Sequence, residues 1–240
     1  MLERDHQLLR LAADLAILTV RDSRLQALVI TRRNPPYAGQ SALPGGFLRA
    51  GEDVRQAAVR ELREETGLDG EAEALHLEQL SVYSDPDRDP RGRVVSVTFL
   101  ALSPDLPVPQ AGSDAQHAFW APVDEIRGTL AFDHDQILND AVERARSRLE
   151  YTTLATAFCE PKFTIGDLRR VYEVVWGAVL DPRNFSRKVM RTNGFVRPTG
   201  RKRAPETGRP ATLYERGPAQ LLTPPLMRGA WRMKSLASSA

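Results

Sequence analysis

The sequence has little cysteine and no long apolar run. Its single cysteine, Cys159, excludes an intramolecular disulfide and is typical of a reducing compartment. No apolar stretch approaches the roughly 18 residues that a membrane-spanning helix needs. The first residues, Met1 to His6, carry no secretory signal pattern. The sequence therefore predicts a cytoplasmic protein with no membrane partner.

The two parts of the chain differ in charge. Residues 151–240 contain 16 lysines and arginines against 6 acidic residues, a net charge of +10. Residues 1–150 contain 17 against 25, a net charge of −8. At 240 residues, with 42% hydrophobic residues, the chain is long enough for two domains that each have a core. A basic second domain indicates a nucleic-acid partner, and a basic surface with no partner is the alternative.

The stretch from Gly46 to Leu68 is the most informative part of the sequence. Asp53 and Gln56 form a capping-box pattern that begins a helix, and Gly67 is suited to end it. At 3.6 residues per turn, one face of this helix is apolar, and acidic residues follow its edge: Glu61, Glu64 and Glu65. Like charges four residues apart repel each other, so the cluster indicates a divalent cation held by oxygen ligands. The alternative is an acidic helix whose glutamates face water.

The spacing in this stretch resembles the signature of the Nudix hydrolase family. That signature is Gly, five residues, Glu, seven residues, then Arg-Glu-apolar-any-Glu-Glu-any-Gly-apolar, and the sequence matches it at every fixed position. The resemblance implies hydrolysis of a nucleoside diphosphate linked to another group, with Mg²⁺ or Mn²⁺. The catalytic residues that it implies are Glu52, Arg60, Glu61, Glu64 and Glu65.

The same resemblance assigns roles within this set. Glu61 and Glu65 ligate the metal, Glu64 and the carbonyl of Gly45 assist them, and Glu52 pairs with Arg60 to hold the loop against the helix. A further acid from a later loop often completes the catalytic base in this family. Four residues are candidates, and the sequence does not choose among them: Asp85, Asp87, Asp89 and Asp114.

The rest of the first domain, residues 1–151, reads as an α/β fold. Strands are expected over residues 13–20, 25–31, 75–83, 94–102 and 119–122, and a second helix over residues 135–151. This order agrees with the α/β/α sandwich that the Nudix resemblance implies. The loop from Ser84 to Arg93 resembles the corresponding loop of Nudix proteins that handle ADP-ribose. Three arginines there suit a diphosphate: Arg88, Arg91 and Arg93. The alternative is a plain hairpin connection.

Aromatic residues elsewhere in this domain are candidates for a nucleoside pocket, with packing as the alternative for each: Tyr37, Phe119, Trp120 and His134.

The second domain, residues 152–222, reads as a winged helix-turn-helix. Thr164 and Asp167 form a capping box that begins one amphipathic helix, and Asp181-Pro182 begins the next. The basic residues of the second helix are expected to read DNA: Arg187, Lys188 and Arg191. A turn-rich segment follows, and its basic residues are expected to contact DNA phosphates or the minor groove: Arg201, Lys202 and Arg203. Residues 223–240 read as a flexible tail.

A Nudix domain followed by a basic winged helix resembles the Nudix-related transcriptional regulators of NAD metabolism, the NrtR type. The resemblance extends through Arg183-Asn184-Phe185, Pro198-Thr199-Gly200 and Gly208-Arg209-Pro210. It implies a homodimeric repressor that binds double-stranded DNA and whose Nudix domain binds ADP-ribose or a related nucleoside diphosphate. Many members of that family have a decayed signature, whereas this sequence keeps every signature residue, so residual hydrolysis is expected. The alternative is an active ADP-ribose pyrophosphatase with a basic accessory domain that braces it.

Overall fold

The computed structural model describes residues 8–66, 76–102, 115–204, 210–231 and 234–235. Several predicted features lie outside these residues: Gly67 and Leu68 of the signature, Asp114, and Gly208-Arg209. The described chain forms two compact units. One contains the chain up to residue 18 together with residues 26–141, and the other contains residues 19–25 together with the chain from residue 142. The units are described separately.

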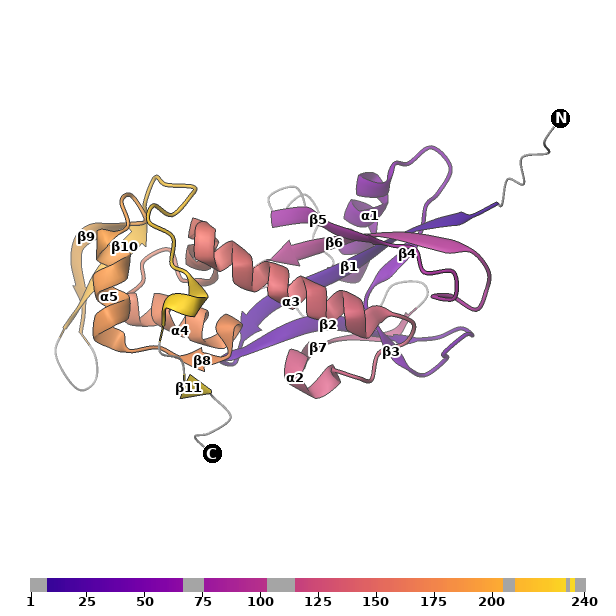
Figure 1. The fold of residues 1–240 in the computed structure, drawn as a ribbon, viewed down its shortest axis with the longest axis horizontal. Helices are drawn as coiled ribbons and strands as arrows, with labels where there is room; N and C mark the ends of the chain where they lie inside the picture. Colours follow the sequence, from indigo (N-terminus) through magenta and orange to yellow (C-terminus); the bar gives the residue numbers. More distant parts are fainter. Residues whose placement is uncertain (1–7, 67–75, 103–114, 205–209, 232–233, 236–240) are drawn as a thin grey trace. The chain divides into compact units, whose positions relative to one another are not determined.

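The first unit is built on one seven-stranded sheet (Figure 1). Its main strand order is β3-β2-β1-β6-β5, while β4 pairs with β1 and β7 pairs with β2. The strands are β1 (Arg10–Arg21), β2 (Arg24–Arg32), β3 (Ser41–Ala42), β4 (Gly45–Phe47), β5 (His76–Tyr83), β6 (Val94–Leu102) and β7 (Ala115–Pro122). The five expected strands are confirmed. The sequence did not reveal β3 and β4 because two or three residues are too few to show a period.

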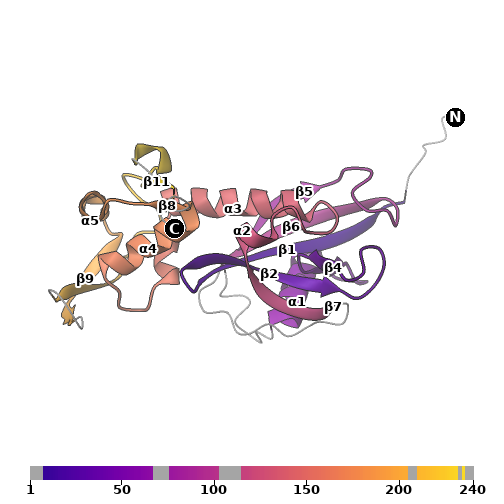
Figure 2. The ribbon, with the colours of Figure 1, turned by 90° about the horizontal axis from the view of Figure 1, so that it is seen from below.

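Helices cover both faces of this sheet. They are α1 (Val54–Thr66), the short α2 (Val123–Ile126) and the first half of α3 (His134–Tyr151). Figure 2 shows α1 and α3 on opposite faces of the strands. Ala58 and Leu62 of α1 pack in a buried cluster with residues of the sheet such as Leu15, Leu28 and Phe99. The expected α/β/α sandwich is therefore confirmed.

The second unit contains a helix-turn-helix followed by a two-stranded wing (Figure 1). Its elements are η1 (Thr153–Phe158), α4 (Ile165–Trp176), β8 (Ala178–Val179), α5 (Pro182–Arg191), β9 (Val196–Arg203), β10 (Ala211–Arg216), η2 (Arg228–Ala230) and β11 (Lys234–Ser235). The Thr164–Asp167 capping box is present, and Gly177 ends α4 with φ of 66°. Asp181 caps α5 by accepting a hydrogen bond from the Asn184 N–H at 2.7 Å. The predicted winged helix is confirmed.

Two expectations for this unit need correction. Arg201, Lys202 and Arg203 lie on strand β9 rather than in a turn-rich loop, because β9 pairs with β10 as far as Arg203. The described part of the supposed flexible tail is packed rather than flexible. Leu226 is 1% exposed and Trp231 is 8% exposed, so apolar side chains hold this segment in place. The predicted domain boundaries, after residues 151 and 222, stay a prediction.

No helix within the described ranges is long and apolar enough to cross a membrane.

Candidate functional site

Arg60 ties the loop before α1 to the helix. Its Nη2 lies 2.8 Å from Oε1 of Glu52, and its Nε donates to Oε2 at 3.0 Å. Glu52 also accepts a hydrogen bond from the N–H of Arg49. These hydrogen bonds, first the one from Arg60, lower the pKa of Glu52 to about 2. The expected pairing of Glu52 with Arg60 is confirmed, and it keeps Glu52 ionised over the physiological range.

Glu61 is the buried carboxylate of α1, with 8% of its surface exposed. It accepts a hydrogen bond from Nη1 of Arg60 at 2.6 Å. Its carboxylate also lies directly against the backbone of Gly46, where any Cβ atom would collide with Oε1 of Glu61. Glycine is therefore required at position 46 for the helix and β4 to approach each other. Burial raises the pKa of Glu61, which a nearby cation would reverse.

The residues around Glu61 fit a hard divalent cation by their chemistry. Mg²⁺ and Mn²⁺ prefer oxygen ligands, and Glu61, Glu64 and the Gly45 backbone supply them. Glu64 accepts a hydrogen bond from Nη2 of Arg49 at 3.1 Å. Within the described residues, no group of three or more acidic, histidine or cysteine side chains is close enough to hold a metal. Glu65 lies on α1, but its side chain is not among those the structure describes.

A cavity opens beside Gly45 and Gly46, and its wall includes Phe47, Arg91 and Phe132. The guanidinium of Arg91 lies 5.1 Å from the ring centre of Phe47 and 5.5 Å from that of Phe132. Asp89 holds Arg91 from the side, with Nη2 to Oδ2 at 2.7 Å. Arg91 is therefore fixed at the cavity wall with a side chain that is still 35% exposed.

The other two arginines of the loop have different surroundings. Arg88 has a side chain that is 4% exposed, and it binds Asp133 at 2.7 Å and Asp14 at 3.3 Å. Burial works to lower the pKa of Arg88, but these two carboxylates outweigh it and raise the pKa. Arg93 donates to the carbonyl of Ser84 at 2.8 Å. Of the three arginines expected to bind a diphosphate, Arg88 and Arg91 line the same cavity and Arg93 does not, and the charge of Arg88 is already paired. Their role in binding stays a prediction.

Among the acids considered as catalytic bases, Asp89 is held by Arg91, whose hydrogen bonds lower its pKa against the opposing effect of burial. Asp85 accepts a hydrogen bond from the N–H of Asp87 at 2.9 Å, and both line a second cavity with Arg88. The choice between them stays open, and Asp114 lies outside the described residues.

The aromatic candidates for the nucleoside pocket divide into two groups. Tyr37 contacts Phe132 edge to face at 4.8 Å, next to the cavity. His134 lies in the cavity wall, where its Nδ1 accepts the N–H of Leu43 at 2.9 Å and burial lowers its pKa. By contrast, Trp120 packs on the cluster of α1, and Phe119 is 38% exposed on β7.

Sequence reasoning missed several residues of the cavity, among them Asp14 and Phe132. Asp14 is an acid inside the apolar run of β1, and its Oδ2 accepts Ser96 Oγ at 2.5 Å. A lone charge in a buried strand is a signal for a buried polar network. Phe132 has a φ of 59°, a backbone conformation that is rare for a bulky residue. Residues in such conformations cluster at functional sites. No sequence pattern announces that conformation.

In the second unit, α5 presents a basic surface. Arg187 and Arg191 are exposed, as expected, and Nη2 of Arg187 lies 2.7 Å from Oδ1 of Asn184. Lys188 differs from the expectation, because its Nζ lies 3.9 Å from the ring centre of Trp231. Arg183, one turn before Arg187, is also exposed. Its spacing of four residues from Arg187 was the available signal, and it was missed.

The basic residues of the wing differ in whether an acidic side chain pairs with them. Arg201 and Lys202 are exposed on β9. Arg203 is also exposed, but Asp167 of α4 holds it, with Nη1 to Oδ2 at 2.9 Å, and its Nη2 donates to the carbonyl of Lys162 at 3.2 Å. Arg201 and Lys202 therefore have their charges more available to a phosphate backbone than Arg203 does.

A sheet between two helical layers, with Glu52, Arg60 and Glu61 at α1, together with a basic winged helix, defines a Nudix protein with a DNA-binding domain. Comparison with known families agrees. The NUDIX domain family matches residues 10–141, and the NrtR DNA-binding winged helix domain family matches residues 156–215. The chain belongs to the NrtR-type family of Nudix-related transcriptional repressors.

Individual relatives are consistent with this assignment. The ADPR responsive transcriptional repressor NtrR of Acinetobacter baylyi is 33% identical over 85% of this chain and 80% of its own. The crystal structure of Shewanella oneidensis NrtR complexed with a 27mer DNA superimposes with a TM-score of 0.70 at 30% identity, covering 87% of this chain and 94% of that one. An ADP-ribose pyrophosphatase of Methanocaldococcus jannaschii is 45% identical over 47% of this chain and 63% of its own.

Proposed function

We propose that this protein is a transcriptional repressor of NAD-metabolism genes that binds ADP-ribose in its Nudix unit and DNA through its winged helix. The observation that carries the proposal is the presence in one chain of two separate binding surfaces. One is the cavity beside Gly46, with Arg91 fixed between two aromatic rings. The other is the row of exposed arginines on α5.

The cavity offers the chemistry that ADP-ribose needs. The guanidinium of Arg91 suits the diphosphate, because planar bidentate donors match phosphate oxygens. The rings of Phe132 and Tyr37 supply an aromatic surface for the base or the sugar. Glu61, Glu64, Glu65 and the Gly45 carbonyl are the residues that would hold Mg²⁺ or Mn²⁺. Such an ion, when bound, offsets the charge of the diphosphate and helps activate water.

The DNA-binding unit supports a dimeric repressor. One helix-turn-helix covers a half-site, and proteins of this class usually pair to read a palindrome. We therefore expect a homodimer. The dimer can hold its two reading helices in more than one arrangement. A nucleotide that binds the dimer more tightly in one arrangement than in another changes the affinity for DNA by the difference in its binding free energies, typically about 1–3 kcal/mol.

Selection of duplexes from a random library, followed by mobility shifts, tests the repressor proposal. The duplexes recovered should resemble segments upstream of NAD-metabolism genes and should bind more tightly than scrambled duplexes of the same composition. ADP-ribose should change the affinity for the selected duplex roughly 5- to 150-fold, and ribose 5-phosphate serves as the control ligand. Equal binding of selected and scrambled duplexes, with no effect of ADP-ribose, would refute the repressor function.

A second function, slow hydrolysis of ADP-ribose, is favoured by the intact arrangement of Glu52, Arg60 and Glu61. We propose that the Nudix unit converts ADP-ribose to AMP and ribose 5-phosphate at a low rate in the presence of Mg²⁺. Product analysis of the wild type and of Glu65→Gln tests this, with the exposed Glu125→Gln of α2 as a matched control. Equal and negligible turnover in the wild type and Glu65→Gln would mean that the unit only senses its ligand.

A further inference from the structure

The chain beyond the wing returns to the helix-turn-helix and packs there. We call residues Leu221–Trp231 the C-terminal segment. The N–H of Leu222 donates to the carbonyl of Tyr151 at 2.8 Å, and that of Leu226 donates to the carbonyl of Glu150 at 2.9 Å. The segment lies beyond residues 156–215, which match the winged helix family. The segment is held to α3 by these specific backbone contacts.

The last turn of the segment is held by charged contacts to α3. Nη2 of Arg228 lies 2.9 Å from Oε2 of Glu143, and its N–H donates to Oε1 of Glu150 at 2.7 Å. The first hydrogen bond from Arg228 lowers the pKa of Glu143, so this pair stays charged at neutral pH. These contacts fix the chain three residues before Trp231.

Trp231 itself is fixed by α4 and α5. Its ring lies 5.8 Å from that of Phe185 and 6.2 Å from that of Trp176. Lys188 of α5 places its Nζ 3.9 Å from the Trp231 ring centre and 3.5 Å from the carbonyl oxygen of Ala230. This is a cation–π contact, and tryptophan is the aromatic side chain that attracts a cation most strongly. Lys188 is thus engaged on the inner side of α5.

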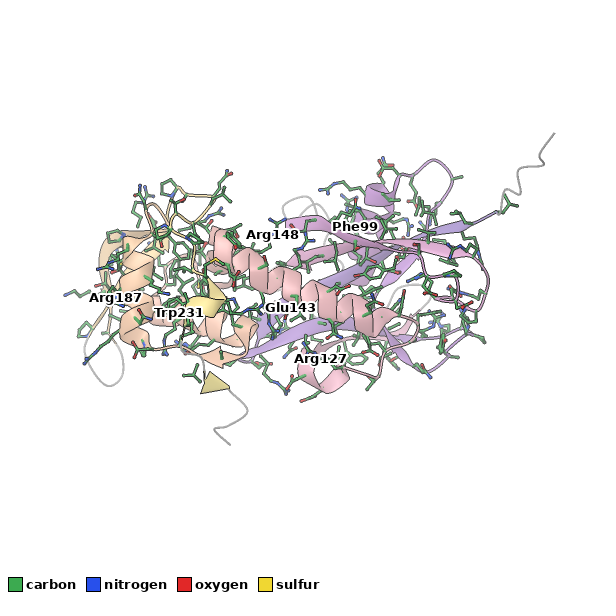
Figure 3. The ribbon with its side chains drawn as sticks, viewed as in Figure 1. Phe99, Arg127, Glu143, Arg148, Arg187 and Trp231 are labelled. Atoms are coloured by element: carbon green, nitrogen blue, oxygen red, sulfur yellow. The ribbon has the colours of Figure 1, made fainter. Side chains whose placement is uncertain are left out.

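Phe185 and Val189 of α5 are buried in the core of the unit, and the engagement of Lys188 beside them leaves another side of α5 open. Successive residues of a helix are about 100° apart, so fixing Lys188 on one side directs Arg187 to another. Figure 3 shows Arg187 on the outer side of α5 and Trp231 on the inner side, near the end of the C-terminal segment. The exposed side chains follow the spacing i, i+4, i+7 and i+8: Arg183, Arg187, Met190 and Arg191. We call these four residues the reading face.

We propose that Trp231 is a positioning residue for DNA recognition, because it packs on the buried Phe185 and holds Lys188, and thereby helps to set the rotation of α5 that presents the reading face to the major groove. This inference rests on the proposed repressor function. Double-stranded DNA is the occupant that the face fits. Three guanidinium groups suit guanine edges and phosphates, and Met190, which is 53% exposed among them, suits the methyl group of thymine.

The test compares Trp231→Ala, Trp231→Phe and Lys188→Met in the full-length protein. For each variant, the affinity for the selected duplex and for a scrambled duplex of the same composition is measured at fixed salt. Trp231→Ala should reduce the ratio of the two affinities by about tenfold, and Lys188→Met by a smaller factor. Trp231→Phe should restore most of the ratio because it keeps an aromatic face. Met227→Ala, an exposed change in the same segment, is the control.

A loss of folded protein would lower the two affinities equally, so the ratio separates positioning from stability. If Trp231→Ala does not fold, Lys188→Met carries the test, since it keeps the length of the side chain. An unchanged ratio in the folded variants overturns the positioning role, and so does an equal loss on both duplexes. An unchanged ratio in Arg183→Ala would remove Arg183 from the reading face and overturn its proposed orientation. Failure of the wild type to discriminate between the duplexes would instead overturn the proposed function itself.

Discussion

The arginines beside the cavity of the first unit and those on α5 of the second unit have opposite surroundings. In the Nudix unit, Arg60 and Arg88 are surrounded by carboxylates, and the Arg88 side chain is 4% exposed. In the winged helix unit, Arg183, Arg187 and Arg191 stand on the surface of α5. A buried, paired arginine holds other groups at fixed positions, which is what recognition of a small ligand requires. An exposed arginine keeps its charge available for phosphates and base edges.

Buried and exposed charges also differ in how much their removal changes the stability of the fold. A buried charge is stable only with its partners, and removing one partner leaves the other uncompensated. An exposed charge can be removed with little effect on stability. Removing a buried, paired arginine should therefore affect folding, whereas removing an exposed arginine of α5 should affect binding.

The largest effect on stability is expected for Arg88→Met. The methionine keeps the apolar stem but leaves Asp14 and Asp133 buried without their cation. The free energy of unfolding should fall by about 3–5 kcal/mol. Urea denaturation followed by circular dichroism measures this, with Arg187→Met as the matched control, for which a change within about 0.5 kcal/mol is expected. Similar stabilities of the two variants would contradict the distinction between the units.

The next largest effect is expected for Glu61→Gln, which keeps the shape of the side chain but removes its charge. The proposed Mg²⁺-dependent hydrolysis should fall by about 100-fold, because a metal ligand supplies several kcal/mol of charge stabilisation. Binding of ADP-ribose without metal should be retained, since Arg91 is unchanged. Calorimetric titration and product analysis separate the two properties, with Glu125→Gln as the control. Retained hydrolysis in Glu61→Gln would exclude it as a metal ligand.

A smaller effect should distinguish two neighbouring residues of the wing. Lys202→Ala should lower the slope of log affinity against log salt by about one, because Lys202 is exposed and can neutralise one phosphate. Arg203→Ala should lower it less, because Asp167 already holds Arg203 at 2.9 Å. Fluorescence anisotropy over a range of salt concentrations provides both slopes. A larger change for Arg203 than for Lys202 would mean that DNA displaces Asp167.

Much of this architecture could be predicted from the sequence. The long strands and helices have clear periods, and the helix ends at Thr164, Gly177 and Asp181 follow local rules of capping. The pairing of Glu52 with Arg60 followed from the family signature. In each case the information lies within one segment or in a fixed spacing.

The features that were missed depend on contacts between distant segments. Arg88 meets Asp14 from β1, and Lys188 meets Trp231 from a segment that had been taken for a flexible tail. A basic residue in a loop looks the same in the sequence whether it faces solvent or a buried acid. Phe132 acquires its positive φ from its surroundings rather than from its own preference.

The smallest effect concerns Asp167, an acid of the basic unit that pairs with Arg203 and Arg170. Burial works to raise the pKa of Asp167, but its hydrogen bonds with Thr164 and the two arginines outweigh this and lower the pKa below its ordinary value of 3.8. A carboxyl group with a lowered folded-state pKa stabilises the fold above its unfolded-state pKa. That contribution is lost as the pH falls below about 4. Asp167→Asn should therefore cost about 1 kcal/mol at pH 7, and the difference from the wild type should shrink towards pH 3. Denaturation at several pH values measures it, with the exposed Glu160→Gln as the matched control. A difference that stays constant with pH would show that the hydrogen bonds, and not the charge of Asp167, stabilise the start of α4.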